Sequence, residues 1–262
     1  MKLNLSVAIN AALSAGVEIL KVYDTDFNVE IKGDDSPLTL ADKKANDVIN
    51  SYLLPTEIPI ISEENKQLPY TKRKNWTKCW IVDPLDGTKE FIKRNGEFTV
   101  NIALVENGNP VMGVIYVPVT KTLYFTSDRN TSKKIVLDTI DISPEEIDRK
   151  ASIISPQPIN GLVKIVGSRS HLNEDTENFI AEVEKKNNVE IVSMGSSLKF
   201  CMVAEGLAHI YPRYAPTMEW DTAAGHAICN AAGVEVIDRA TNAPMQYNKE
   251  NLLNNHFLVK SK

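Results

Sequence analysis

The chain has 262 residues, of which 43% are hydrophobic and 24% are charged. These values are typical of a globular protein, and the length fits one large domain or two closely packed ones. The formal net charge is −5, which argues against a nucleic-acid polymer as a partner because the charges would repel each other.

The cysteine content points to a reducing compartment. Cys79, Cys201 and Cys229 are odd in number, lack CxxC spacing and have mainly apolar neighbours. No signal sequence opens the chain, and no apolar run approaches the roughly 20 residues that a membrane span requires. We therefore expect a cytoplasmic protein without an integral membrane segment, with peripheral contact to the inner membrane left open.

The chain begins with two expected helices. Residues 3–23 carry apolar side chains around most of a helix, and 39–54 form a second helix stopped by Pro55. Thr39 and Asp42 have the spacing of a helix-capping box, with Asp in place of the usual Glu.

Strands follow these helices. Two short buried strands are expected at 58–62 and 80–82, and each ends at acidic residues. Loose alternation of apolar residues then predicts antiparallel strands at 98–105, 111–118 and 122–127. This half of the chain reads as α+β.

Residues 128–161 are polar and contain several prolines, so we expect a weakly structured stretch and a domain boundary there. The predicted domains are 1–155 and 156–262. Strands and helices alternate after the boundary, which is the α/β pattern. The expected strands are 163–168, 189–195, 209–213 and 234–237, and the expected helices are 173–186, 196–208 and 221–232.

The run WIVDPLDGTKEF (80–91) is the most informative in the chain. It places Asp83 and Asp86 three residues apart on a proline-containing turn, directly after an apolar strand, and Gly87 and Thr88 then open a helix. Carboxylate oxygens suit Mg²⁺, and the N–H groups at a helix start suit a phosphate. The alternative is a pair of Asx turns around Pro84, although the motif contains more than a turn requires.

Glu63 and Asp221 stand at comparable places, after a strand and at a helix start. For Asp221 alone, a role as helix N-cap is the commoner one. The sequence has no P-loop, GxGxxG, GxSxG or HExxH motif, and the spacing around Gly87 does not fit an EF-hand. With no evident covalent nucleophile, a metal-activated water is the expected attacking group.

Three motifs together resemble the inositol-monophosphatase superfamily, and because their order and rough spacing match, the likeness spans nearly the whole chain. They are Glu63-Glu64, the run DPLDGT at 83–88, and Trp220-Asp221 followed by Ala223-Ala224-Gly225. The resemblance implies a Mg²⁺-dependent, lithium-sensitive phosphomonoesterase with a layered αβαβα sandwich.

Longer stretches at 83–105, 195–206 and 211–227 resemble the 3′(2′),5′-bisphosphate nucleotidases within that superfamily. Inositol monophosphatases usually carry Thr-Asn-Phe after DGT, where this chain has Lys-Glu-Phe (89–91). The implied reaction is hydrolysis of adenosine 3′,5′-bisphosphate (PAP), a by-product of sulfate assimilation, to AMP and phosphate. An inositol monophosphatase, a fructose-1,6-bisphosphatase and a non-catalytic PAP sensor are the alternatives.

The resemblance also implies the ligands of two Mg²⁺ ions, with a third bound weakly beside Glu63. Glu63, Asp83 and the backbone carbonyl of Leu85 would hold the first ion, and Asp83, Asp86 and Asp221 the second. Most of these ligands fall in the predicted N-terminal domain.

The catalytic water would be oriented and deprotonated by Thr88, backed by Asp42, with Glu63 at the same centre. This role of Asp42 competes with the capping-box interpretation. The positive charge of Lys32 would stabilise the carboxylate of Asp42.

The resemblance further implies two phosphate subsites. Leu85, Asp86, Gly87, Thr88 and Asp221 would surround the scissile phosphate, with the N–H groups of Gly87 and Thr88 as donors.

Ser196, Lys199 and Arg213 would receive the second phosphate, and 167–171, with Arg169, would frame the nucleoside. Surface ion pairs are the alternative for these three cations. The expected partner is a small-molecule nucleotide, and the chain is expected to be a monomer or a homodimer.

Overall fold

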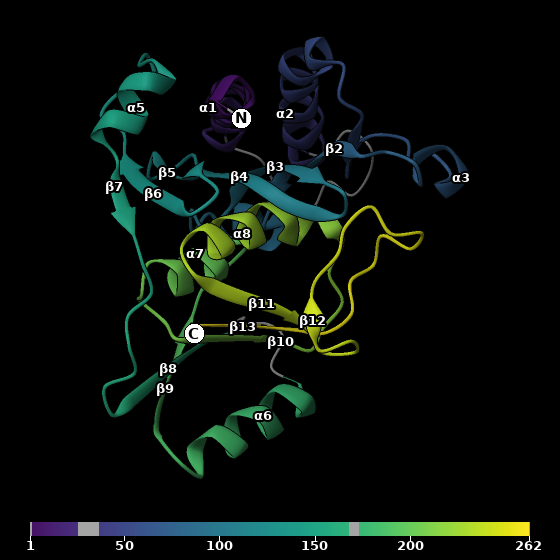
Figure 1. The fold of residues 1–262 in the computed structure, drawn as a ribbon. Helices are drawn as coiled ribbons and strands as arrows, with labels where there is room; N and C mark the ends of the chain where they lie inside the picture. The colour runs from purple at the N-terminus through teal and green to yellow at the C-terminus, as the bar shows by residue number, and fades with distance from the viewer. Residues whose placement is uncertain (1, 26–36, 168–172, 262) are drawn as a thin grey trace.

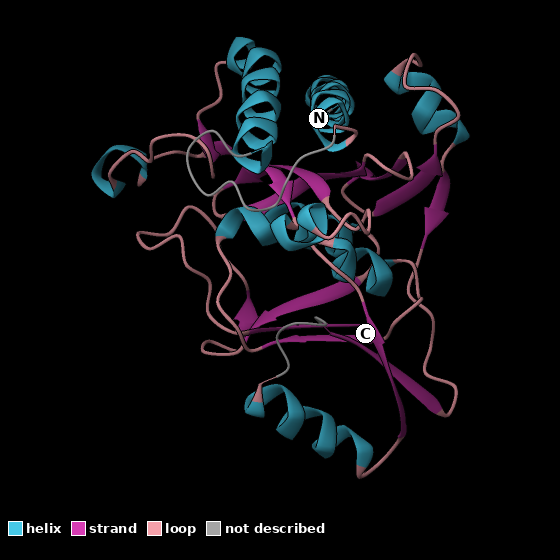
Figure 2. Cartoon of the chain, turned by 180° about the vertical axis from the view of Figure 1, so that it is seen from behind, coloured by secondary structure: helices cyan, strands magenta, loops and turns pink. Residues whose placement is uncertain are grey.

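The computed structural model describes residues 2–25, 37–167 and 173–261. Two β-sheets alternate with three helical layers, as views from opposite sides show (Figure 1, Figure 2). Helices α1 and α2 form the first layer, α7 and α8 lie between the sheets, and α6 covers the far face of the second sheet. The predicted αβαβα sandwich is thereby confirmed. The helices of these layers are α1 (Lys2–Tyr23), α2 (Pro37–Leu53), α6 (Glu174–Glu184), α7 (Leu198–Ala204) and α8 (Glu219–Ala231).

The first sheet has seven strands whose spatial order equals their order in the chain. Only the pairing of β1 with β2 is parallel, and the other neighbours are antiparallel. The strands are β1 (Ile60–Ser62), β2 (Lys78–Asp86), β3 (Thr99–Glu106), β4 (Asn109–Val117), β5 (Thr122–Asp128), β6 (Thr131–Val136) and β7 (Ser152–Ile154).

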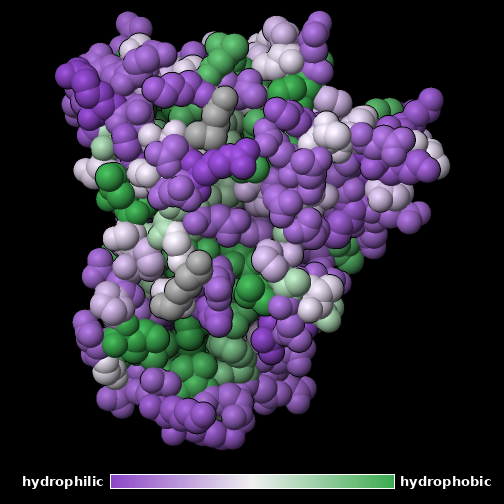
Figure 3. All heavy atoms as spheres, in the orientation of Figure 1, coloured by the Kyte–Doolittle hydropathy of each residue, from purple (hydrophilic) through white to green (hydrophobic). Residues whose placement is uncertain are grey.

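The second sheet has six strands in the order β12-β11-β13-β10-β8-β9. Its β10, β8 and β9 are parallel neighbours, while β13 is antiparallel to both β10 and β11. The hydrophobic residues visible in Figure 3 gather mainly over this sheet, above α6. The strands are β8 (Leu162–Gly167), β9 (Asn188–Ser193), β10 (Ile210–Arg213), β11 (Val234–Asp238), β12 (Ala243–Pro244) and β13 (Phe257–Ser261).

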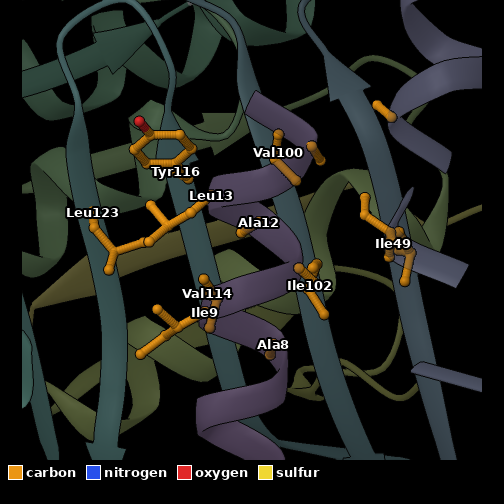
Figure 4. Packing of buried hydrophobic residues seen from close by; sticks show 14 of the residues in the cluster. Ala8, Ile9, Ala12, Leu13, Ile49, Val100, Ile102, Val114, Tyr116 and Leu123 are labelled. Atoms are coloured by element: carbon orange, nitrogen blue, oxygen red, sulfur yellow. The ribbon is translucent and has the colours of Figure 1, made fainter. Parts of the chain in front are cut away.

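Helix α1 packs on the outer face of the first sheet. Its Ala8, Ile9, Ala12 and Leu13 meet strand side chains such as Val114 in one core cluster (Figure 4). The small alanines let the helix approach the sheet closely. The helix is also long and apolar enough to span a membrane, so the expectation that no segment reaches that length is wrong. Its apolar character is explained by the core that it helps to form.

The expectation of a weakly structured stretch at 128–161 is also wrong. This segment contains β6, α5 (Pro144–Lys150) and β7. The hydroxyl of Ser143 accepts a hydrogen bond from the N–H of Glu146 at 3.2 Å, and Pro144 occupies the first turn. The sequence Ser-Pro-Glu-Glu at 143–146 is therefore the signal of a helix start.

The chain passes from the first sheet to the second between Ile154 and Leu162. The predicted division into domains 1–155 and 156–262 stays a prediction. The two halves are closely joined, since helix α8 of the second half packs on the first sheet. Its Ala223 and Ala224 belong to the same buried cluster as Ala103 and Ile115. One hydrophobic layer thus joins both halves.

Contact between α8 and β4 requires a glycine. A Cβ added at Gly113 would lie 2.3 Å from the carbonyl oxygen of Ala224, which is backbone and therefore cannot simply rotate away. The absence of a side chain at Gly113 thus sets how closely the middle helical layer approaches the first sheet.

We expect Gly113→Ala to lower the free energy of unfolding by about 3 kcal/mol, through overpacking between β4 and α8. Gly161→Ala is the control, because its new methyl group meets nothing within 4 Å, although the backbone φ is +79°. That strained backbone alone should cost about 1 kcal/mol. Urea unfolding measures both, and equal losses would show that the close approach is not limiting.

Candidate active site

The acidic motif lies at the end of strand β2 rather than on a turn after it. β2 continues through Asp86, so the expected strand end at residue 82 is wrong. Asp83 pairs with Asn101 and Asp86 with Thr99, which leaves an irregularity in the register between them. A bulge is a reasonable response to Pro84, which has no N–H for the ladder.

The predicted alternative for this motif, an Asx turn, is partly present as well. The N–H of Leu85 donates to Asp83 Oδ1 at 3.1 Å. Asp83 itself is only 1% exposed. The turn contact uses one carboxylate oxygen and does not account for the burial of an acidic side chain among other acids.

Gly87 ends this stretch in a left-handed conformation, with φ of 99°, and serves as the N-cap of helix α4 (Thr88–Ile92). Only glycine adopts such a backbone without strain. The predicted helix start at Gly87 and Thr88 is therefore confirmed, and Thr88 is exposed at its first position.

Glu63 is placed beside this motif by strand pairing. β1 runs parallel to β2 with Ser62 opposite Val82, and the N–H of Glu63 donates to the carbonyl of Val82 at 3.2 Å. Glu63 thus follows β1 at the level of Asp83. Desolvation first, and then the charges of Asp86 and Glu64, raise the pKa of Glu63 to about 6, and a hydrogen bond with Asp83 opposes the rise.

Asp42 faces the same acids from helix α2. The helix begins at Pro37, so Thr39 lies inside it and the predicted capping box at Thr39 and Asp42 is wrong. Burial, followed by the charges of Glu64 and Glu63, raises the pKa of Asp42 to about 8. Asp42 is therefore part of the acidic cluster.

Asp221 comes from helix α8 and is not its N-cap, which is Met218. Its Oδ2 accepts a hydrogen bond from the N–H of Met218 at 2.8 Å, three residues back along the chain. One carboxylate oxygen caps the helix and the other remains for another partner. Burial first, and then the charge of Asp86, raise the pKa of Asp221 to about 7.

The carboxylates of this cluster repel one another, and Lys199 and Arg213 offset the repulsion only in part. Burial raises the pKa of Asp83 well above its usual range, and Asp86, Glu63, Asp221 and Asp42 all raise it further. Such a group of carboxylates fits a divalent cation, which would replace mutual repulsion by attraction. Within the described part of the chain, no three His, Cys, Asp or Glu side chains form a complete metal-ligand set.

Asp86 and Asp221 also line a pocket of about 220 Å³ between the two halves of the molecule. The predicted substrate residues Gly87, Thr88, Ser196, Lys199 and Arg213 line it too, although they come from distant parts of the chain. Leu85 is not among its lining residues. Thr217, Thr222, Tyr211 and Phe200 complete much of the remaining wall.

Two polar atoms of this wall are buried without a partner among the described residues. They are Ser196 Oγ and Arg213 Nε. Lys199 is 5% exposed, and its Nζ donates to the carbonyl of Ser196 at 2.6 Å. Burial lowers the pKa of Lys199 to about 8, although Asp86 opposes this. A bound anion would accept hydrogen bonds from these donors, and its charge would make the bonds from Arg213 and Lys199 stronger than those to water.

Sequence reasoning missed three residues around Asp86, namely Thr99, Asn101 and Ser197. Thr99 and Asn101 are polar residues at buried positions of an otherwise apolar strand, with 0% and 1% exposure. That interruption of the apolar pattern is a signal that could have identified them. Lys32 and Arg169, for which roles were expected, lie outside the described residues.

The layered fold and its acidic pocket define the class of this protein, and the comparison with known families agrees. The chain belongs to the inositol monophosphatase family, whose pattern matches residues 3–261.

Individual relatives are more specific than the family. The chain is 44% identical over 252 residues to the 3′(2′),5′-bisphosphate nucleotidase CysQ of Salmonella typhimurium, covering 95% of this chain and 96% of that protein. The crystal structure of CysQ from Bacteroides thetaiotaomicron has 51% identity and a TM-score of 0.92, covering 99% of this chain and 97% of the other. An inositol monophosphatase from Zymomonas mobilis, at 19% identity and a TM-score of 0.76, shares the fold.

A charge-removing substitution tests whether the cluster binds a cation. We expect Mg²⁺ to raise the melting temperature of the wild type, since ligand at 100 times its Kd stabilises by about 2.7 kcal/mol. Asp83→Asn should lose this response and melt no lower than the wild type in chelator, because the substitution relieves repulsion. Exposed Asp141→Asn is the control and should keep the response. An undiminished Mg²⁺ response in Asp83→Asn would contradict metal binding at this cluster.

Proposed function

We propose that this chain is a Mg²⁺-dependent 3′(2′),5′-bisphosphate nucleotidase that hydrolyses PAP to AMP and phosphate. The observation that carries the proposal is the pocket, which joins the acidic residues Asp86 and Asp221 to Ser196, Lys199 and Arg213. A substrate with two phosphates matches a pocket with a cation-binding end and a cationic end. The names of the relatives support the same substrate.

The metal ligands would be the residues expected from the sequence. Glu63, Asp83 and the carbonyl of Leu85 would hold one Mg²⁺, and Asp83, Asp86 and Asp221 another, with a weak third ion beside Glu63. When bound, these ions would supply Lewis acids that acidify a water and neutralise the leaving oxygen. Asp83 would be shared because it is the most deeply buried of these carboxylates.

The proton of the attacking water would pass to protein groups. Thr88 Oγ1 would orient the water and accept its proton while donating its own to the carboxylate of Asp42. The pKa of Asp42, raised to about 8 by burial, makes it a stronger base than an ordinary aspartate. Glu63 would belong to the same catalytic centre, as a ligand of the ion that supplies this water.

The two phosphates would bind at opposite ends of the pocket. The N–H groups of Gly87 and Thr88 would donate to the scissile phosphate. Arg213 would donate from its guanidinium and Ser196 from its hydroxyl to the second phosphate, with Lys199 as a point charge. Gly167, at the end of β8, marks where the segment expected to frame the nucleoside begins.

The same proposal includes the cell biology of the enzyme. Its three cysteines are free and buried, which supports a reducing, cytoplasmic location. A role in sulfur metabolism and inhibition by lithium would follow from the assignment to bisphosphate nucleotidases.

Phosphate release from three substrates tests the assignment. With Mg²⁺ present, PAP should give the highest kcat/KM, above inositol monophosphate and fructose 1,6-bisphosphate, because only PAP places a second phosphate on a nucleoside. Faster turnover of inositol monophosphate would overturn the assignment. Binding of PAP without phosphate release at saturating Mg²⁺ would instead favour a sensor.

Removal of the Thr88 hydroxyl tests the proton path. Thr88→Ala should lower kcat by roughly 10²–10⁴-fold, the range typical of general-base assistance. The Mg²⁺-induced rise in melting temperature should persist, since Thr88 is not a proposed ligand. Thr88→Ser keeps the hydroxyl and should retain most activity. If Thr88→Ala abolished the response to Mg²⁺, the residue would be structural.

A further inference from the structure

Asp86 is held by two donors that the proposed reaction does not use. Its Oδ2 accepts hydrogen bonds from the backbone N–H of Ser197 at 2.5 Å and from Asn101 Nδ2 at 3.4 Å. The same oxygen therefore receives one donor from the second half of the molecule and one from strand β3 of the first sheet. These bonds restrict the rotation of the carboxylate.

The side chain of Ser197 closes this arrangement into a ring. Ser197 Oγ lies 2.8 Å from Asn101 Oδ1 and 2.9 Å from Thr99 Oγ1. The amide oxygen of Asn101 can only accept, so the hydroxyl of Ser197 donates to it and the hydroxyl of Thr99 donates to Ser197. Each proton then has a defined acceptor.

The three residues that support Asp86 are buried. Ser197 is 2% exposed, Asn101 1% and Thr99 0%. A buried polar group that loses its partner is costly, so the members of such a ring fix one another's orientation. Asp86 consequently has one preferred orientation before any cation arrives.

The same residue anchors the pocket's cationic end. Ser197 follows Ser196, whose φ of 46° is unusual for a residue other than glycine, and precedes Lys199 by two positions. This segment also lies close to the glycine of the acidic motif, since a Cβ added at Gly87 would be 3.2 Å from the Cβ of Ser196. The bond from Ser197 to Asp86 thus ties the two ends of the pocket together.

We propose that Ser197 is a positioning residue that sets the orientation of Asp86 and the distance from the acidic cluster to Ser196 and Lys199. The expected effect of Ser197 on metal affinity follows from the hydrogen bonds around Asp86 alone and does not depend on the substrate. Its effect on substrate preference rests on the proposed function, because only a bisphosphate would contact both ends. An adenosine monophosphate that carries only the scissile phosphate would need the acidic end alone.

Ser197→Ala tests the proposal, with Ser132→Ala as a matched control. Ser132 is also fully buried, and its hydroxyl donates to the carbonyl of Ile228 at 2.8 Å, so it joins the two halves away from the pocket. Both variants lose one buried hydroxyl and should lose similar stability in urea unfolding. Ser197→Ala keeps the backbone N–H bond to Asp86 but releases the amide of Asn101, the other donor to that carboxylate. Only this variant should therefore raise the half-saturating Mg²⁺ concentration, by about 10-fold, as loss of an outer-shell partner of a ligand usually does.

Substrate kinetics add a second measurement to the same pair. In Ser197→Ala the ratio of kcat/KM for PAP to that for adenosine 3′-monophosphate should fall by roughly fivefold, about what one hydrogen bond of positioning contributes. Ser132→Ala should leave this ratio unchanged. Substitutions at Thr99 provide an independent test in case Ser197→Ala does not fold. Thr99→Val removes the donor and should shift both quantities in the same direction, whereas Thr99→Ser should restore them.

The outcomes separate this inference from the proposed function. If the wild type released phosphate from neither nucleotide, the function would be wrong, yet the Mg²⁺ dependence of the melting temperature would still test Ser197. If Ser197→Ala and Ser132→Ala lost equal stability and shared the wild-type Mg²⁺ dependence, Ser197 would be an ordinary packing residue and the inference would be overturned.

Discussion

Repulsion among closely placed carboxylates around the buried Asp83 is the constraint on which the rest of this structure depends. Asp83 is buried, and all the neighbours that shift its pKa raise it. A cluster of this kind opposes folding unless its members hold protons or share a cation. The fold brings these acids together nonetheless, from β1, β2, α2 and α8. Such an arrangement is expected where function rather than stability has selected the residues, and a divalent ion of the kind proposed would resolve the repulsion.

The scaffold holds each acid by a different local device. Pairing of β1 with β2 brings Glu63 to the level of Asp83, and a bulge turns Asp86. Asp221 caps the start of its own helix with one oxygen. These devices use backbone geometry, so the carboxylates keep their places without needing one another. The close packing of α8 on the first sheet at Gly113 then fixes Asp221 relative to the other acids.

The sequence predicted much of the order of helices and strands, and the acidic motif, because these are encoded locally, whereas the layered sandwich was implied by the family resemblance. Apolar periodicity identifies α1, and the run from Asp83 to Thr88 needs no distant partner to be recognised. Other features depend on tertiary contacts. The strand through Asp86 could not be foreseen, since Pro84 normally ends a strand unless a bulge accommodates it. Nor could sequence show that Ser197 meets Asn101, because 96 residues separate them and only the packing of the two halves brings them together.

The proposed selectivity and metal binding would therefore depend on the contact between the halves rather than on either half alone. The acidic motif lies in the first half, whereas Asp221, Ser196, Lys199 and Arg213 all come from the second. A shift of the second half by even one ångström would move Asp221 away from Asp86 and change the span between the two phosphate-binding ends. The ring of Asp86, Ser197 and Asn101, which Thr99 supports through Ser197, spans this contact at the point where both distances are set. Buried hydrogen bonds suit that task better than apolar packing, because their direction as well as their length is specified.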